Sequence, residues 1–254
     1  MDDGHHLPRC GMRIPVQPPF PWERLLRYLS VRSTPGLESV TADRYVRHGT
    51  AEVTFDSVRN ELECPEEYAA RVIRLFDASH NPRAVDAFLR KAKLPVFPGV
   101  RVPGCWNSFE LCLRVIIGQQ VSVKGAHTLM GRLAARCPTL LAEEVATADL
   151  SAIGIPGRRV QTLQILAERV AAGDIQFDAA WPDVAEQLRR VPGFGPWTLG
   201  YLGIRLGRDP DAFPEQDLGL IRAAGASSPR DLLRIAERWR PWRAYAAMCL
   251  WMGE

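Results

Sequence analysis

The fold is decided where one helical segment stops and another starts, at Val191-Pro192-Gly193-Phe194-Gly195-Pro196-Trp197-Thr198. The two glycines of this stretch predict a hairpin between helices, which leaves backbone N–H groups free at a helix start. The positive end of the peptide dipoles there favours an anion such as a DNA phosphate. A lone carboxylate follows in Phe213-Pro214-Glu215-Gln216-Asp217-Leu218-Gly219. Together the two stretches predict that a polymer held by the hairpin backbone lies close to Asp217.

Helical patterns extend from this hairpin in both directions. Residues 108–117 are apolar nearly all round, which predicts a buried helix. Further helices are predicted over residues 122–136, 157–172 and 181–190. At residues 228–231 a capping serine, a proline and an acid predict another helix start. Residues 153–157 resemble the hairpin but lack its tryptophan, and we interpret them as a structural turn. The chain beyond a turn-rich linker at 94–104 is therefore predicted to be all-helical.

The first part of the chain has mixed signals. Residues 22–29 fit a short helix, whereas residues 50–56 alternate between apolar and polar, as a half-buried strand does. A second strand is predicted over residues 60–64. Pro65 stands where a first helical residue would, and apolar residues recur at helical spacing over 68–76. This pattern predicts an amphipathic helix on a small antiparallel sheet, an α+β unit.

The composition is typical of a globular protein with reduced cysteines and without a membrane span. The chain has 254 residues with 46% hydrophobic content, enough for a sizeable core. It begins with no signal segment and contains no apolar run of spanning length, which predicts a cytoplasmic protein that is nucleoid-associated when bound to DNA. The six cysteines form no C-x-x-C pair, which indicates reduced thiols. Residues 1–13 are predicted to be an irregular lead-in, either the protein's own start or the remnant of a longer or fused precursor.

The distribution of charge is more informative than its sum. A net charge of +3 does not by itself indicate a nucleic-acid partner. Four arginines, however, bracket the hairpin: Arg189, Arg190, Arg205 and Arg208. Six more follow it: Arg222, Arg230, Arg234, Arg238, Arg240 and Arg243. For the helix over 230–243 two interpretations stay open, a surface that faces DNA and a solvated face paired with carboxylates.

A family resemblance covers nearly the whole chain. It is carried by the hairpin with Trp197-Thr198, by the downstream aspartate, and by the tail Ala236-Glu237-Arg238-Trp239-Arg240-Pro241-Trp242-Arg243-Ala244-Tyr245. It extends to Arg101-Val102-Pro103-Gly104-Cys105, to Ile117-Gly118-Gln119-Gln120-Val121-Ser122 and weakly to Gln17-Pro18-Pro19-Phe20. These motifs closely resemble the helix-hairpin-helix/Gly-Pro-Asp DNA glycosylases, in particular the DNA-3-methyladenine glycosylase II (AlkA-type) branch.

The resemblance implies a fold and a division into domains. An N-terminal antiparallel-sheet domain, residues 1–79, precedes an all-helical helix-hairpin-helix core of two subdomains. Residues 80–99 and 207–254 form the subdomain that carries Asp217, and residues 100–206 form the one that carries the hairpin. The implied activity is that of a monofunctional DNA glycosylase. It hydrolyses the N-glycosidic bond of alkylated purines, of the 3-methyladenine and 7-methylguanine type, during base excision repair. Its implied partner is double-stranded DNA with damaged bases, bound by a monomer and without a membrane.

Asp217 is the predicted catalytic residue. Departure of a base leaves positive charge on the deoxyribose, so a fixed negative charge is needed close to the anomeric carbon. Taken alone, an aspartate before the apolar-periodic Leu218, Leu220 and Ile221 indicates a helix N-cap. Its position twenty residues after Trp197 matches the family and favours the catalytic role.

The remaining site residues are carried over by resemblance. The base pocket maps to four aromatic residues, Trp197, Tyr201, Trp251 and Tyr28, and a core role is the alternative for each. Alkylated purines are cationic and electron-poor, so aromatic faces bind them by stacking and cation–π attraction. DNA binding maps to the amides of Gly193 and Gly195, to Thr198, and to Gln120. This glutamine stands where the best-known member has a leucine that fills the gap left by the flipped base. Trp239 and Trp242 are predicted to be structural.

The absence of a hairpin lysine and of clustered C-terminal cysteines also bears on the reaction and on cofactors. Family members that nick the backbone carry a lysine two positions after the second hairpin glycine, where this chain has Trp197. Its only lysines are Lys91, Lys93 and Lys124. We therefore predict water as the nucleophile and no AP-lyase activity. Only Cys249 lies in the region where relatives hold an iron–sulfur cluster, so no cluster and no required cofactor is predicted. A monovalent cation at the hairpin carbonyls is compatible with the resemblance.

Two other functions stay open from sequence. The first is a glycosylase for deaminated or oxidised bases, because aromatic residues alone do not fix the pocket's preference. The second is a non-catalytic helix-hairpin-helix DNA-binding protein, against which the spacing of Asp217 and the aromatic set argue. Release of bases from methylated duplex DNA would discriminate between them.

Overall fold

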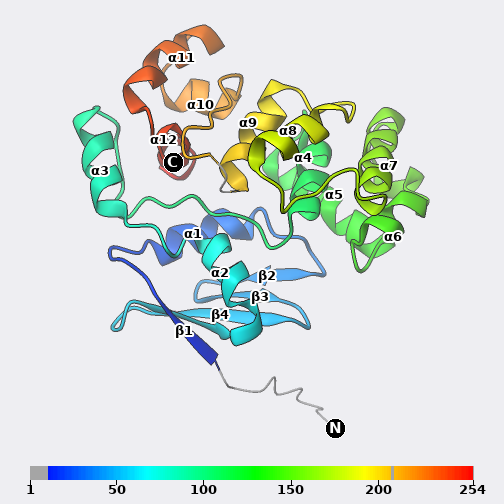
Figure 1. Ribbon diagram of the computed structural model, residues 1–254, viewed down its shortest axis with the longest axis horizontal. Helices are drawn as coiled ribbons and strands as arrows, with labels where there is room; N and C mark the ends of the chain where they lie inside the picture. The colour runs from blue at the N-terminus through cyan, green and yellow to red at the C-terminus, as the bar shows by residue number, and fades with distance from the viewer. Residues whose placement is uncertain (1–10, 207–208, 254) are drawn as a thin grey trace.

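The computed structural model describes residues 11–206 and 209–253, and a small antiparallel sheet lies beneath a larger body of helices (Figure 1). Five strands form the sheet: β1 Gly11–Pro15, β2 Glu38–Val40, β3 Arg44–Arg47, β4 Ala51–Asp56 and β5 Glu61–Pro65. Their order is β1-β5-β4-β3-β2, and every neighbouring pair is antiparallel. A sheet domain followed by helices confirms the predicted α+β class.

Two helices lie between the sheet and the helical body (Figure 1). They are α1, Trp22–Ser30, and α2, Ala69–Phe76, which continues a short 3-10 turn, η1, at Glu66–Tyr68. One face of α1 is buried and the other faces solvent, as its amphipathic sequence predicts. The helix predicted over 22–29 and the strands predicted over 50–56 and 60–64 are confirmed.

The prediction that residues 1–13 are irregular is wrong for its last three residues. Gly11, Met12 and Arg13 belong to β1 and pair with Pro65, Cys64 and Glu63 of β5. Only Ile14 of this edge strand is buried, so its sequence carries no alternation that would reveal a strand. Residues 1–10 lie outside the described residues. Pro65, predicted as a first helical residue, is the last residue of β5.

Strands β2 and β3 were not predicted, and the reason is a buried charge. In β3 the inward residues are Tyr45 and Arg47, so the alternation pairs an aromatic with an arginine. Arg47 is buried because its guanidinium donates two hydrogen bonds to the carboxylate of Glu110, one of them 2.8 Å long. This ion pair joins the sheet to the helical body.

The helical body follows the predicted boundaries closely. Its α-helices are α3 Pro82–Lys91, α4 Ser108–Gly118, α5 Val123–Arg136, α6 Ala142–Thr147, α7 Gly157–Ala171, α8 Trp181–Arg189, α9 Pro196–Arg205, α10 Leu218–Ala223, α11 Pro229–Ala236 and α12 Arg243–Met252. Two 3-10 turns, η2 Ser151–Ile153 and η3 Glu237–Trp239, interrupt them. Side chains of Asn107, Ser122 and Ser228 cap α4, α5 and α11 by accepting hydrogen bonds from the first-turn amides. The four predicted helices and the predicted start at 228–231 are confirmed.

The buried apolar residues form two separate cores. The first joins the sheet, α1 to α3 and the linker to Trp106 with the C-terminal helices α10 to α12. The second lies among α4 to α9. Helix α9 contributes to both, since Leu202 belongs to the second core and Ile204 to the first. The division into the three units predicted above stays a prediction.

Two further observations concern the chain as a whole. Within residues 11–206 and 209–253, no helix is long and apolar enough to cross a membrane. The five described cysteines, Cys64, Cys105, Cys112, Cys137 and Cys249, are free thiols. Burial raises the pKa of the Cys249 thiol to about 12, so this group is protonated in the folded protein.

Candidate active site and DNA-binding face

Asp217 stands at the start of α10, after a tight turn. Its backbone N–H donates to the carbonyl of Pro214 over 2.9 Å, and its φ and ψ of −71° and 117° are those of an N-cap residue. Its side chain accepts a hydrogen bond from the N–H of Leu220 over 2.9 Å. The predicted N-cap role is therefore confirmed.

The carboxylate of Asp217 is also held by two tryptophans. Trp197 Nε1 donates to Oδ2 over 3.0 Å, and Trp251 Nε1 donates to Oδ1 over 3.2 Å. An ordinary N-cap needs neither bond. The two indoles come from α9 and α12, so three helices fix the position of this one carboxylate.

Glycines on two helices make this arrangement possible. A Cβ at Gly200 of α9 would lie 3.2 Å from the carbonyl oxygen of Phe213, and one at Gly203 would lie 3.0 Å from the Cβ of Ala212. The segment that leads to Asp217 can therefore lie directly against α9. At Gly219 a Cβ would lie 3.0 Å from Asp217 Oδ1 and 3.7 Å from the Trp251 ring. Its absence leaves room for the bond between carboxylate and indole.

The predicted pocket aromatics lie together beside this carboxylate. Trp197 stacks on Tyr201 with ring centroids 5.7 Å apart and planes 19° apart. The Trp251 ring also contacts Tyr201, with centroids 5.6 Å apart and planes 58° apart. All three residues are partly exposed, unlike Trp239, which is 1% exposed in the first core. The structure thus brings Trp197, Tyr201, Trp251 and Asp217 into one group.

Tyr28 joins this group through Arg205, a residue to which the sequence assigned no role at the site. The guanidinium of Arg205 lies 5.1 Å from the Tyr28 ring centroid and 5.8 Å from that of Tyr201. It donates to the Tyr201 hydroxyl over 2.9 Å and to the carbonyls of Pro103 and Gly104 over 2.8 and 2.7 Å. Arg205, one of the four arginines that bracket the hairpin in sequence, is 3% exposed and so is not part of a charged surface beside it. The i, i+4 spacing from Tyr201 was the sequence signal for this contact.

The two phenols differ in acidity. Burial opposes ionisation of both, but at Tyr201 the nearby Arg205 and Arg32 guanidiniums outweigh it and lower the pKa to about 8. At Tyr28 burial prevails and raises the pKa to about 12. Tyr28 is 4% exposed, and its hydroxyl has no hydrogen-bond partner among the described residues. The pair supplies hydroxyl groups of unequal acidity at the edge of the aromatic group.

The hairpin presents backbone amides, as predicted. Gly193 has φ of +86°, a left-handed conformation that favours glycine, and Gly195 is the N-cap of α9. In the part of the chain that the structure describes, no acceptor pairs with the N–H groups of Gly193, Gly195, Trp197 and Thr198. An open hollow of about 500 Å³ runs along residues 191–195, with Arg189 and Arg190 on its rim. These features fit a phosphate at the start of α9.

The other predicted DNA-binding residues differ in exposure. Gln120 is exposed in the turn between α4 and α5, with φ of +60°, and its neighbours Val121 and Val123 are exposed too. Thr198 is 2% exposed, and its hydroxyl donates to the Gly193 carbonyl over 3.3 Å. Its side chain therefore supports the hairpin from within. Arg208 lies outside the described residues.

Three of the six arginines that follow the hairpin are paired with carboxylates. Arg240 and Arg243 both donate to Asp211, at 2.6 and 2.8 Å, and Arg234 pairs with Asp231 at 2.8 Å. For these three, the interpretation as a face paired with carboxylates is confirmed. On the hairpin side Arg189 and Arg190 both pair with Glu186, so arginine pairing does not distinguish the two sides, and the candidate for DNA contact rests on the free hairpin amides.

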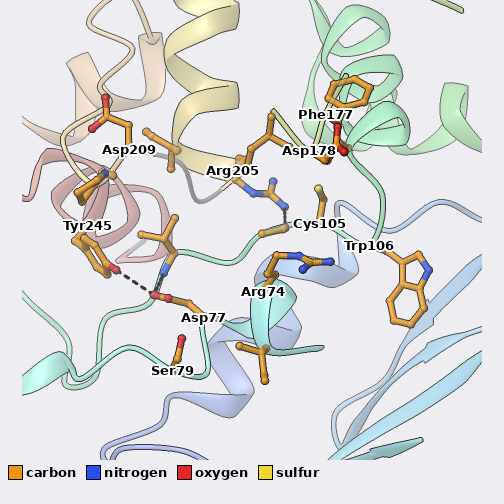
Figure 2. A pocket seen from close by; sticks show the side chains of 18 of the residues that line it. Arg74, Asp77, Ser79, Cys105, Trp106, Phe177, Asp178, Arg205, Asp209 and Tyr245 are labelled. Carbon is orange, nitrogen blue, oxygen red and sulfur yellow. Dashed lines mark hydrogen bonds between the residues drawn. The ribbon is translucent and has the colours of Figure 1, made fainter. Parts of the chain in front are cut away.

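A cavity of about 810 Å³ opens at the far end of α9 from the hairpin (Figure 2). Arg74, Arg205 and Asp209 bring charged groups to it, and the Tyr245 hydroxyl donates to Asp77 over 3.3 Å. Burial raises the pKa of the Asp77 carboxyl to about 6. The described residues that line this cavity include none of the predicted site residues, so it is separate from Asp217.

Comparisons with known proteins agree with this arrangement. Residues 11–107 match the family model of the AlkA N-terminal domain. The DNA-3-methyladenine glycosylase 2 of Escherichia coli is 31% identical over 272 residues, which cover 94% of this chain and 95% of that protein. The chain belongs to the DNA-3-methyladenine glycosylase 2 family. The resemblance identified from the hairpin, the aspartate and the tail is confirmed.

One further sequence relative and one solved structure are similar to this member of the glycosylase 2 family. A probable bifunctional transcriptional activator/DNA repair enzyme AlkA of Mycobacterium tuberculosis is 32% identical over 95% of this chain, and the chain spans 56% of its length. A 3-methyladenine DNA-glycosylase structure from Archaeoglobus fulgidus superposes with a TM-score of 0.77 at 19% identity, covering 94% of this chain and 96% of that one. This likeness confirms the fold, a sheet domain followed by a helix-hairpin-helix core.

Proposed function

We propose that this chain is a monofunctional DNA glycosylase that hydrolyses the N-glycosidic bond of alkylated purines in double-stranded DNA during base excision repair. The observation that carries the proposal is the Asp217 carboxylate, which two indole N–H groups and a backbone amide hold beside stacked aromatic rings. The name of the Escherichia coli relative, DNA-3-methyladenine glycosylase 2, supports the purine class.

The carboxylate acts on charge that develops in the sugar. As the C–N bond breaks, the electron pair leaves with the base and the anomeric carbon becomes cationic. A fixed anion near that carbon stabilises the transition state without having to reorganise. An ionised carboxylate has about four acceptor sites, and three are used here. Water then adds to the cationic carbon and loses a proton, which leaves an abasic site.

The aromatic group supplies the place for the base. A base inside a duplex has to leave the stack before Asp217 can approach its sugar. Rings of Trp197, Tyr201 and Trp251 offer π faces to a cationic alkylpurine. The free N–H groups at Gly193 and Gly195 support a grip on a phosphate of the same strand.

The enzyme is proposed to lack lyase activity. A Schiff base requires a lysine amine at the sugar. The position that holds it in bifunctional relatives is Trp197, whose indole instead donates to Asp217. We expect no covalent adduct after borohydride treatment and no strand cleavage without alkali. Trp197→Lys is not expected to create lyase activity, since the introduced amine would also need a lowered pKa and the variant loses a donor to Asp217.

The cofactor and assembly proposals are separate from this chemistry. Among the described residues no group of histidines, cysteines and carboxylates could hold a metal ion, and an enzyme without an iron–sulfur cluster stays a prediction. A monovalent cation at the hairpin would have to share carbonyls that are already used. Gly193 accepts from Gln119 and Thr198, and Val191 accepts from the N–H of Phe194 over 3.2 Å. We propose that the protein acts as a monomer, which light scattering checks.

The decisive experiment measures base release. Duplex DNA treated with a methylating agent is incubated with the protein, and freed bases are separated by chromatography. We expect 3-methyladenine and 7-methylguanine, together with alkali-labile sites in the DNA. Duplexes with one deaminated or one oxidised base form the competing arms. Preferential release from those arms would replace the alkylpurine assignment, and DNA binding without release of any base would indicate a binding module.

A further inference from the structure

Gln119 connects two predicted DNA-binding elements that are far apart in the sequence. It is the residue after α4 and directly precedes Gln120. Its Nε2 donates to the carbonyl of Gly193 over 2.9 Å and lies 3.4 Å from the Thr198 hydroxyl. That hydroxyl also donates to the Gly193 carbonyl, over 3.3 Å. One hairpin carbonyl thus accepts from two side chains, on α9 and at the end of α4.

These bonds fix the central peptide unit of the hairpin. The Gly193 carbonyl and the Phe194 N–H belong to one planar peptide. The carbonyl is held by Gln119 and Thr198, and the N–H is held by the carbonyl of Val191 over 3.2 Å. The free N–H groups of Gly193 and Gly195 lie on either side of this unit. Their directions therefore depend on a peptide that Gln119 helps to hold.

The side chain of Gln119 does not serve its own helix. Its backbone N–H already closes α4 by donating to Ile116 over 3.3 Å. The side chain is only half-buried and reaches across to residue 193 instead. A bond of this kind contributes little to a core, but it joins the exposed Gln120 turn to the hairpin.

We propose that Gln119 is a positioning residue that couples the two contacts to DNA. By holding the Gly193 carbonyl, it keeps the hairpin amides directed at a phosphate and keeps the Gln120 turn at a fixed distance from them. This rests on the proposed function, because it assigns Gln119 a part in the binding step of that same site. Loss of the hydrogen bond from Gln119 to Gly193 should weaken the binding of a phosphate by the hairpin amides. It should also reduce the contribution of Gln120 to the affinity for DNA.

The binding test uses a duplex with a tetrahydrofuran abasic-site analogue and fluorescence anisotropy. Gln119→Leu should raise the Kd about tenfold, which is the effect of about one hydrogen bond. The slope of log affinity against log salt concentration should become shallower by about one, the share of one phosphate contact. The change Gln120→Ala should weaken binding less in the Gln119→Leu background than in the wild type. Gln164→Leu is the matched control, since Gln164 Nε2 also donates to a backbone carbonyl, that of Ala148, over 3.3 Å. The control should bind as the wild type does.

A second variant separates positioning from mere packing. Gln119→Glu keeps the shape but loses the donor, and its ionised carboxylate repels both the Gly193 carbonyl and a phosphate. Its affinity should fall further than that of Gln119→Leu at pH 8 and recover toward wild type as the pH falls below the ordinary glutamate pKa of about 4.3, where the protonated carboxyl donates again. A purely structural role predicts no such recovery. Equal affinity of Gln119→Leu and wild type, or a pH-independent Gln119→Glu, would overturn the proposal.

Hydrogen exchange keeps the proposal testable without DNA. In the free protein, Gln119→Leu should speed amide exchange in residues 191–198 and leave the similar turn at 153–157 unchanged. Unchanged exchange at the hairpin would refute the positioning role. If the wild type neither binds the duplex nor releases bases while exchange responds as expected, the proposed function fails and the hairpin contact of Gln119 stands.

Discussion

The two hydrophobic cores supply different kinds of atoms to the site. The first core contributes side chains, the Asp217 carboxylate with the Trp251 indole and the Tyr28 phenol. The second alone also contributes backbone, the free amides of Gly193 and Gly195, beside the rings of Trp197 and Tyr201. A reaction at one sugar needs one placed charge, whereas a grip on DNA has to work at any sequence and uses phosphates. Changes on the two sides should therefore separate chemistry from binding.

The largest expected effect is on the side-chain half. Asp217→Asn deletes the charge and conserves the shape, so base release in single-turnover assays should fall by at least about 10²- to 10³-fold. Affinity for an abasic-analogue duplex should stay within about twofold, since the phosphate grip lies on the other core. Glu215→Gln, a carboxylate of the same segment, should leave both unchanged. A variant Asp217→Asn that retains more than about a tenth of the rate would end the assignment.

The next effect is on the backbone half. Gly193→Ala forces an L side chain into φ of +86°, and Gly154→Ala does the same at +88°. Both should lose about 1 kcal/mol of stability in denaturant titrations. Only Gly193→Ala should also weaken duplex binding, by about tenfold, because the proposed phosphate grip lies at this turn, beside Asp217. Equal binding by the two variants would show that the hairpin backbone does not hold DNA.

A smaller effect is expected at the exposed turn of the second core. If Gln120 fills the space of the flipped base, Gln120→Ala should slow excision from duplex a fewfold more than from single strands, where less stacking has to be replaced. Gln120→Leu should largely preserve activity. Equal slowing of both substrates would contradict the wedge role and indicate a structural amide.

The smallest effect on activity is expected at Asp77, which lies away from both halves of the site and acts on the pH dependence of stability. The pKa of Asp77 is raised to about 6, so the folded protein binds this proton more tightly than the unfolded chain does. Its contribution to stability is full below the unfolded pKa near 3.8 and is lost as pH rises to about 6. The wild type should therefore lose on the order of 2 kcal/mol between pH 4 and pH 7 relative to Asp77→Asn. Thermal unfolding of both proteins across this range checks the sign, and a parallel pH dependence would refute it.

Much of the fold could be predicted because local and global signals agree. Helix α4 is apolar nearly all round and is buried over most of its length, and Ser228 both marks and caps α11. Asp217 was found because its spacing from Trp197 is a sequence property, and the bond between the two confirms their proximity.

What could not be predicted depends on contacts between distant residues. Arg47 is an inward residue of a strand only because Glu110 neutralises it, and no local pattern reveals such a partner. Arginine is mostly exposed, and the burial of Arg205 depends on hydrogen bonds to the carbonyls of residues 103 and 104, about a hundred positions away in the sequence. The contact of Gln119 with Gly193 joins two motifs that were recognised separately.

Helix α9 fixes the distance between the hairpin and the linker because it packs into both cores. It begins at the hairpin, carries the indole that bonds to Asp217 in its first turn, and ends at Arg205, which is tied to the linker. Ten helical residues span about 15 Å, and neither end can shift without disturbing a core. The distance from a gripped phosphate to the attacked sugar is therefore set when the protein folds. If the hairpin holds a phosphate as proposed, the first turn of α9 sets how far along the strand the nucleotide that meets Asp217 lies.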